Sequence, residues 1–248
     1  MDTYLVTGAT GYVGEEVARQ LLAAGKPVTA LGRTRPTLPL PFIQADLTDA
    51  TGLASALAGH SFDRVIHLAS LPGDTGNPTQ MVAVNVNGCQ NLLEWARQAL
   101  VKRFVLTSSI SAYEWYPATP FNPPDHLPVR EDHPCRPKDI YATTKYVQEL
   151  LAMTYYHQYK VPTTALRVTA VIGPRGRGGG RGWGEFARQL ARGKQVQIPH
   201  FSLQEVCHYV DLRDVGQMHV VAAEHPTAVG PIFNCGGPHP PRGADLAA

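Results

Sequence analysis

The chain has 248 residues, of which 44% are hydrophobic and 17% charged, a balance that fits one globular domain with or without a small appended lobe. Its formal net charge of +2 is too small to favour a nucleic-acid partner. The four scattered cysteines show no spacing typical of a zinc site, so we expect reduced thiols and no metal. No apolar run approaches the ~20 residues that span a bilayer, and the first expected strand leaves no room for a leader. These features predict a cytoplasmic protein without membrane contact.

Short apolar runs alternate with longer helical patterns, which is typical of βαβ units around a parallel sheet. We expect strands at Tyr4–Thr7, Val28–Leu31, Phe42–Gln44, Arg64–Leu68, Arg103–Thr107 and Thr163–Arg167. We expect helices at about Tyr12–Ala24, Ala50–Ala58, Thr79–Ala99 and Asp139–Tyr159. The sequence therefore predicts an α/β fold with a doubly wound parallel sheet.

Two segments interrupt this alternation. Trp115–Pro137 contains seven prolines and predicts an extended loop, because proline lacks the amide donor that helices and central strands need. The stretch GPRGRGGGRGWG, Gly173–Gly184, is rich enough in glycine to predict a mobile loop.

Three glycines, Gly8, Gly11 and Gly14, follow the first strand and open the first helix. In that setting glycine permits a tight turn and lets backbone amides approach a pyrophosphate, to which the helix N-terminus adds about half a positive charge. The spacing predicts a dinucleotide site that also includes Thr10, Tyr12 and Val13. The alternative is a tight turn whose glycines serve packing only.

The stretch TGATGYVG resembles the glycine loop of the short-chain dehydrogenase/reductase superfamily, and specifically of its extended branch, the NAD-dependent epimerase/dehydratase family. Further motifs follow in that family's order: ADLTD at Ala45–Asp49, HLAS at His67–Ser70, VNVNG at Val84–Gly88 and LTSSISAYE from Leu106. The resemblance implies a Rossmann-type domain over residues 1–172 with the catalytic residues, and over residues 173–248 a small, shortened substrate lobe with the remaining sheet elements.

The resemblance also assigns roles to individual residues. It implies that Asp46 binds the adenine amino group, that Leu47 packs beside the ring, and that Asn85 and Gly88 brace the site. Further expected cofactor contacts are Leu68, Ala69, Ser70 and Thr107, together with Tyr141 and Lys145.

The stretch YATTKYVQE places Tyr141 and Lys145 one helical turn apart on one face. A tyrosine with a reference pKa near 10 needs roughly 4 kcal/mol of help to act as an acid/base near pH 7, and a nearby cation supplies energy of that order. Ser109, after the expected strand Arg103–Thr107, completes the expected catalytic set by binding the reacting oxygen. The alternative is an ordinary exposed Tyr/Lys helix pair.

The implied function is hydride transfer between a nicotinamide and a hydroxyl or keto carbon of a small polar substrate, such as a sugar or a sugar nucleotide, by an epimerase or oxidoreductase. A ketone or aldehyde reductase that uses NADPH is the main alternative, and a non-catalytic NAD(P)-binding regulator is a third. Dehydration is the least favoured activity, because Ile110 and Ser111 offer no acidic pair beside Ser109.

The sequence departs from the family pattern at two positions. Cys207 stands where members that bind nucleotide sugars carry an arginine, and Ala170 stands where an asparagine is common. The arginines of the glycine-rich stretch, Arg175, Arg177 and Arg181, are alternative phosphate binders, although a solvated loop explains them equally well.

The expected second strand ends at Leu31, so Gly32 stands where members that prefer NAD usually carry an acidic residue, and Arg33 follows. A guanidinium there favours the 2′-phosphate, so we expect NADP over NAD by a modest factor. The alternative is that Arg33 stacks on adenine and leaves the two cofactors nearly equal. The resemblance further implies a homodimer through the helices at Thr79–Ala99 and Asp139–Tyr159.

Overall fold

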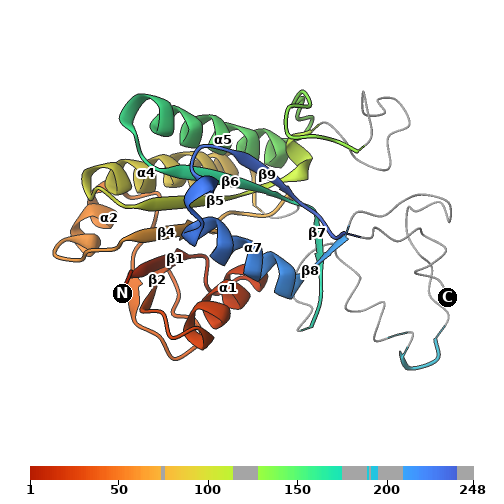
Figure 1. Ribbon diagram of the computed structural model, residues 1–248, viewed down its shortest axis with the longest axis horizontal. Coiled ribbons are helices and arrows are strands. Elements are labelled where there is room, and N and C mark those ends of the chain that lie inside the picture. The colour runs from red at the N-terminus through yellow and green to blue at the C-terminus, as the bar shows by residue number, and fades with distance from the viewer. Residues whose placement is uncertain (74–75, 114–127, 175–188, 190, 195–208, 239–248) are drawn as a thin grey trace.

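A parallel sheet of seven strands organises the computed structural model, which describes residues 1–73, 76–113, 128–174, 189, 191–194 and 209–238 (Figure 1). The strands in spatial order are β3 (Phe42–Gln44), β2 (Val28–Gly32), β1 (Tyr4–Thr7), β4 (Arg64–His67), β5 (Arg103–Ser109), β6 (Thr163–Val168) and β9 (Ile232–Cys235). All neighbouring pairs are parallel. The order reverses between β1 and β4, and the carboxyl ends of strands beside such a reversal are where Rossmann-type sheets bind ligands. The expected fold class is confirmed.

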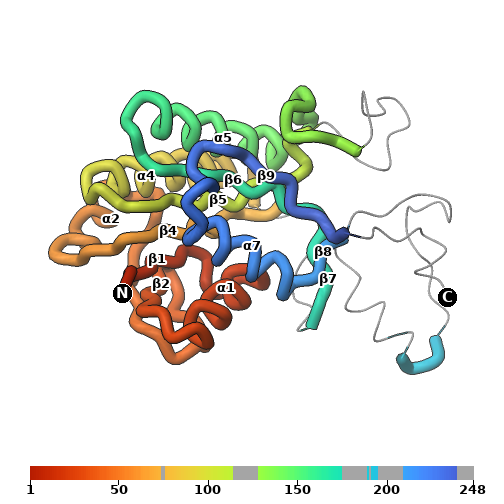
Figure 2. Tube along the Cα trace, in the orientation of Figure 1, coloured from red at the N-terminus to blue at the C-terminus, as the bar shows by residue number. Residues whose placement is uncertain are grey.

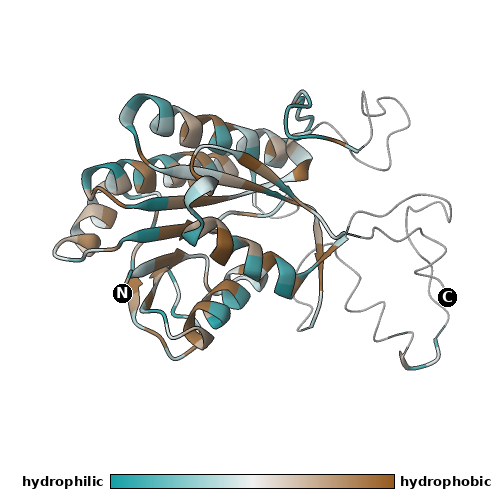
Figure 3. Cartoon of the chain, in the orientation of Figure 1, coloured by the Kyte–Doolittle hydropathy of each residue, from teal (hydrophilic) through white to brown (hydrophobic). Residues whose placement is uncertain are grey.

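Helices cover both faces of the sheet, and apolar side chains of its strands pack against them on each side (Figures 1 and 3). On one face lie α1 (Tyr12–Ala23) and α7 (Leu212–Glu224), which share a core with Val6 and Ile66. On the other lie α2 (Ala50–Leu57), α4 (Gly88–Gln98) and α5 (Ile140–Tyr159), whose core includes Leu5 and Phe104. The tube trace shows α4 and α5 side by side (Figure 2).

The expected helix Thr79–Ala99 is one helical stretch but not a uniform α-helix. It consists of α3 (Pro78–Met81), a π-helix η1 (Val82–Asn87) and then α4. The buried residue of the π-helix is Asn85, and its contacts are described with the site. Apolar spacing alone does not distinguish a π-helical turn from an α-helical one.

Several elements were not anticipated from the sequence. They are β9, α7, the 3-10 helices η2 (Ile110–Ala112) and η3 (Pro226–Ala228), and a separate parallel pair of strands, β7 (Ala170–Ile172) and β8 (Tyr209–Asp211). The short strands β7, β8 and β9, of three or four residues each, carry little periodicity of their own. Strand β5 also runs two residues beyond its expected end, so Ser109 lies within the sheet.

Parts of the two irregular segments fall outside the described residues. Within Trp115–Pro137, residues 128–137 are described and form neither helix nor strand, in line with the expected loop. Residues 175–184 of the glycine-rich segment, including its arginines, are not described, and neither is Cys207. Among the described helices, none is long and apolar enough to cross a membrane.

Candidate active site

The glycine loop between β1 and α1 is shaped mainly by the packing of its own chain. Gly8 has a φ of +75°, and a Cβ there would lie 2.7 Å from the Ala69 amide nitrogen. A Cβ on Gly14 would lie 2.1 Å from the Gly8 carbonyl oxygen. Contacts within the chain therefore leave no room for a side chain at two of the three glycines. Gly11 differs: it is exposed and is the N-cap of α1, which has no side-chain cap. The positive end of α1 is thus presented at the loop.

Thr7 joins this loop to the end of β4. Its hydroxyl oxygen accepts hydrogen bonds from the amides of Leu68 and Ala69, both at 3.2 Å, and lies 2.8 Å from Nδ1 of His67. Burial, with a contribution from the charge of Lys145, lowers the pKa of His67 to about 3. His67 is therefore a neutral strand-end residue, and two of the expected cofactor contacts, Leu68 and Ala69, are held against the glycine loop.

The two residues of the ADLTD segment differ in exposure. Asp46 is exposed, and its Oδ1 accepts from the amide and the hydroxyl of Thr48, at 2.9 and 2.8 Å. The Thr48 amide, aided by the charge of Arg33, lowers the pKa of Asp46 below its ordinary value. Leu47 is buried, and a Cβ on Gly88 would lie 3.0 Å from its Cβ. Gly88 thus lets the helix approach the segment where the adenine is expected.

Tyr141 and Lys145 lie in the first turns of α5, which begins there because Asp139 accepts a hydrogen bond from the Ala142 amide at 2.7 Å. The Lys145 Nζ lies 6.0 Å from the centre of the Tyr141 ring and donates to the Thr107 carbonyl oxygen at 2.9 Å. Lys145 is only 3% exposed, and this burial lowers its pKa to about 8. The structure therefore brings a buried amine, a phenol and the end of β5 together.

Ser109 is the last residue of β5 and the N-cap of η2. Its Oγ accepts from the amide and the hydroxyl of Ser111, at 3.2 and 2.9 Å. The Tyr141 ring packs against the loop after β4, where a Cβ on Gly73 would lie 3.2 Å from its Cγ. Ser109 thus lies at the carboxyl end of a central strand, and the Tyr141 ring lies against the loop that follows the neighbouring strand.

Asn85 of the π-helix connects this region to the loop after β4. Its Oδ1 accepts from the Leu71 amide at 2.7 Å, and its Nδ2 donates to the Leu71 carbonyl at 3.2 Å and the Thr144 hydroxyl at 3.0 Å. Thr144 directly precedes Lys145. Asn85 therefore holds the loop and α5 together, in line with the brace that the family resemblance implies.

Sequence reasoning missed two buried charged residues beside the site, Glu149 and Arg167, which form an ion pair with N and O atoms 2.7 Å apart. The available signal was a charged residue inside the apolar strand Thr163–Val168. A buried charge in that position is rare unless it is paired.

The residues present fit a nicotinamide dinucleotide. Gly11 leaves the N-terminus of α1 open to a pyrophosphate, Leu47 offers an apolar surface near an acidic side chain, and Lys145 supplies a cation at the other end of the site. Within the described part of the chain, no group of three His, Cys, Asp or Glu side chains could hold a metal ion.

A Rossmann-type sheet with this glycine loop and a Tyr/Lys turn beside a strand-end serine defines the extended short-chain dehydrogenase/reductase class. The sequence model of the NAD dependent epimerase/dehydratase family matches residues 4–236, and the chain belongs to that family.

Three known proteins illustrate the relationship. The UDP-glucuronate 4-epimerase of Thermodesulfobacterium geofontis is 34% identical over 196 residues, covering 71% of this chain and 58% of the relative, so the chain spans less than two thirds of that curated protein. The Thermus thermophilus UDP-glucose 4-epimerase in complex with NAD has a TM-score of 0.82 at 27% identity, covering 98% of this chain and 80% of the other. An Agrobacterium tumefaciens short-chain dehydrogenase/reductase superfamily protein with bound NAD has a TM-score of 0.80 at 28% identity, with the same coverage.

Proposed function

We propose that the protein is an NAD(P)-dependent epimerase or oxidoreductase that acts on the hydroxyl or keto carbon of a small polar substrate. One observation carries the proposal: the buried ammonium of Lys145 lies between the Tyr141 ring and the Thr107 carbonyl, two residues before Ser109. The ammonium of Lys145 would stabilise the phenolate form of Tyr141 on the same face of α5, and a stabilised phenolate can accept a proton from the substrate.

Each residue of the set has one task. The nicotinamide, when bound, supplies hydride transfer at the reacting carbon. Tyr141 passes a proton to or from the oxygen on that carbon. Lys145 lowers the cost of the phenolate by an amount on the order of 3 kcal/mol, for a separation of 6.0 Å and an effective dielectric of about 20. Ser109 donates a hydrogen bond to the same oxygen and fixes its position.

A sugar or a sugar nucleotide is the substrate class that the relatives support, because two of those compared are epimerases of UDP-sugars. The specific observation that favours a second candidate, an NADPH-dependent reductase of a smaller carbonyl compound, is Ala170. It is an exposed residue that opens β7, and it offers no side-chain amide to a nucleotide.

We infer that NADP(H) binds more tightly than NAD(H) by a modest factor. Gly32 ends β2, and the exposed Arg33 follows it without an acidic residue that would repel a 2′-phosphate. Arg33 also contributes to the lowered pKa of Asp46, so its charge acts in the region where the adenosine is expected. The two compared structures contain NAD, which makes this preference the part of the proposal that most needs measurement.

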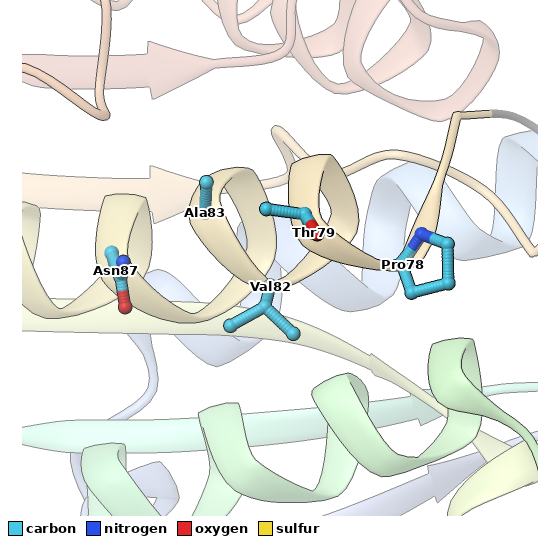
Figure 4. A pocket seen from close by; sticks show the side chains of 5 residues that line it. All are labelled: Pro78, Thr79, Val82, Ala83 and Asn87. Atoms are coloured by element: carbon cyan, nitrogen blue, oxygen red, sulfur yellow. The ribbon is translucent and has the colours of Figure 1, made fainter.

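We infer further that two copies pair through the helical layer formed by α3, η1, α4 and α5. Large apolar side chains are exposed on this layer: Val82, Ile140, Leu150 and Tyr159. Figure 4 shows a shallow depression on the same layer, lined by Pro78, Thr79, Val82, Ala83 and Asn87. Exposed apolar residues on adjacent helices suit a two-fold helical interface.

The proposed function can be tested without a known substrate, by identifying the nucleotide that the protein carries or binds. Purified protein is denatured, any released nucleotide is identified, and the folded protein is titrated with NAD(H) and NADP(H). Retained NAD supports an epimerase, and an empty protein that binds NADPH reversibly supports a reductase. A protein that neither retains nor binds a nicotinamide nucleotide contradicts the proposal. Lys145→Met should weaken binding, whereas Lys160→Met, at the far end of α5, should not.

A further inference from the structure

A buried ion pair lies behind the candidate catalytic residues. Arg167 of β6 donates from Nη2 to Glu149 Oε2 at 2.7 Å and from Nε to both Glu149 oxygens, at 3.0 and 3.2 Å. The two side chains are 4% and 1% exposed. A fork of this kind fixes direction as well as distance, which a single contact does not.

Each partner of the pair also binds a segment that leads to the site. Glu149 Oε1 accepts from the hydroxyl of Ser108, the residue before Ser109. Arg167 Nη1 donates to the Tyr113 hydroxyl at 2.5 Å and to the Glu131 carbonyl at 3.1 Å. The ion pair therefore connects β5, the end of η2, α5 and the segment that precedes α5.

The neighbourhood of Tyr113 extends this network to β9. The Arg167 guanidinium carbon lies 4.4 Å from the centre of the Tyr113 ring, and the Tyr113 hydroxyl donates to Asn234 Oδ1 at 2.8 Å. Asn234 in turn donates to the Val129 carbonyl at 3.0 Å. One guanidinium thus has its donors directed to three segments at once, an arrangement that a lysine ammonium cannot reproduce.

The charge states in this cluster are well defined. Burial acts to lower the pKa of Arg167, but the hydrogen bonds and charge of Glu149 outweigh it and raise that pKa above its ordinary value. Burial also raises the pKa of Tyr113, although Arg167 opposes the shift. Arg167 therefore stays a cation and Tyr113 stays a neutral phenol in the physiological pH range.

We propose that Arg167 and Glu149 are positioning residues that hold the Ser109 end of β5 in register with the Tyr141–Lys145 turn of α5. Glu149 lies one helical turn beyond Lys145 on α5. It also binds Ser108, which is next to Ser109. The hydrogen-bond network of the ion pair therefore contacts the chain beside both Lys145 and Ser109. The inference rests on the proposed function for the identity of the positioned residues.

The structure offers a matched control for the loss of a buried guanidinium. Arg103 opens β5 at the opposite end of the sheet, is 4% exposed, and donates to the Ala222 and His225 carbonyls at 2.8 and 3.0 Å. Arg103→Lys and Arg167→Lys each replace the planar guanidinium group of a buried strand residue by an ammonium group, and both keep the positive charge. Glu149→Gln provides a milder variant, because an amide keeps the size of the side chain and its acceptor oxygen.

The experiment places 3-fluorotyrosine at position 141 and records its fluorine resonance and its titration in the wild type and the three variants. Circular dichroism and thermal unfolding identify the folded proteins. We expect the resonance to move or broaden beyond its own linewidth in Arg167→Lys and Glu149→Gln, and to stay in place in Arg103→Lys. On an accepted substrate, turnover should fall about tenfold or more in the two site variants only.

The inference is overturned if the resonance stays in place in either folded site variant, or if Arg103→Lys moves it equally at a comparable loss of thermal stability. If Arg167→Lys fails to fold, the fluorine resonance of Glu149→Gln tests the inference by itself. The fluorine measurement needs neither cofactor nor substrate. A wild type that binds no nicotinamide nucleotide would therefore contradict the proposed function and leave the result on positioning intact.

Discussion

Lys145 donates a hydrogen bond to the main-chain carbonyl of Thr107, and this contact joins the Tyr141–Lys145 turn of α5 to the end of β5. The side chain of the same threonine lies 2.8 Å from Nε2 of His219 on α7, on the opposite face of the sheet. Thr107 thus connects the two helical layers directly beneath the candidate site.

The contact of His219 predicts a pH dependence of folding stability. Its Nδ1 donates to the Val215 carbonyl at 2.7 Å, so Nε2 accepts from Thr107, and burial lowers the pKa of His219 to about 4. Below pH 6.5 the unfolded chain binds a proton at this histidine that the native protein does not, so stability falls as the pH drops toward 4. We expect the free energy of unfolding, measured in urea titrations, to fall between pH 6 and pH 5. This fall should be about 1 kcal/mol smaller in His219→Gln than in wild type. Equal pH slopes of stability for wild type and His219→Gln would refute the assignment.

The glycine loop predicts a sharp difference between two glycine substitutions. Gly14→Ala should destabilise the protein by at least about 2 kcal/mol, because the new methyl meets a backbone carbonyl that cannot move freely. Gly32→Ala should change stability by less than about 0.5 kcal/mol, since nothing lies within 4 Å of its Cβ position. Chemical unfolding of both variants checks this, and similar stabilities would show that the loop relaxes.

Cofactor preference should depend on one arginine. Wild type is expected to bind NADP(H) about tenfold more tightly than NAD(H), and Arg33→Ala should bring the two affinities close together. Arg35→Ala is the control, because Arg35 lies over the Phe42 ring at 5.1 Å, and the preference should persist there. Fluorescence titration gives the dissociation constants of NAD(H) and NADP(H) for wild type and for each variant. Tighter binding of NAD(H) by wild type, or a ratio that Arg33→Ala leaves unchanged, contradicts the inference.

Association should be sensitive to one helical face. Leu150 on α5 is 50% exposed and Val221 on α7 is 45% exposed, but they lie on opposite layers. Light scattering at micromolar concentration should give a dimer for wild type and Val221→Glu and a monomer for Leu150→Glu. A monomeric wild type would count against the interface.

The parts of the fold that the sequence predicts are those with a repeated pattern. Tyr4–Thr7 is buried throughout and begins with three apolar residues, so its existence was evident. The end of β5 was not evident from the sequence, because Ser108 and Ser109 are polar. Their hydroxyl groups form hydrogen bonds with Glu149 and Ser111, contacts that local composition does not reveal.

The candidate site shows the same division. Tyr141 and Lys145 share a helix, so their spacing places them together, whereas the carbonyl that binds Lys145 comes from a strand 38 residues earlier. Arg167 and Glu149 were missed because their pairing is a tertiary contact between α5 and β6. The glycine loop was assigned to the cofactor as a whole, but Gly8 and Gly14 are explained by contacts within the chain.

The most direct test of the account replaces Tyr141 by Phe, with Tyr146→Phe on the same helix as the control. The account predicts that Tyr141→Phe keeps its fold and its affinity for the nicotinamide cofactor but loses about 10²-fold or more in turnover, while Tyr146→Phe retains both. Unchanged turnover in Tyr141→Phe would contradict the central claim that this phenol moves the proton.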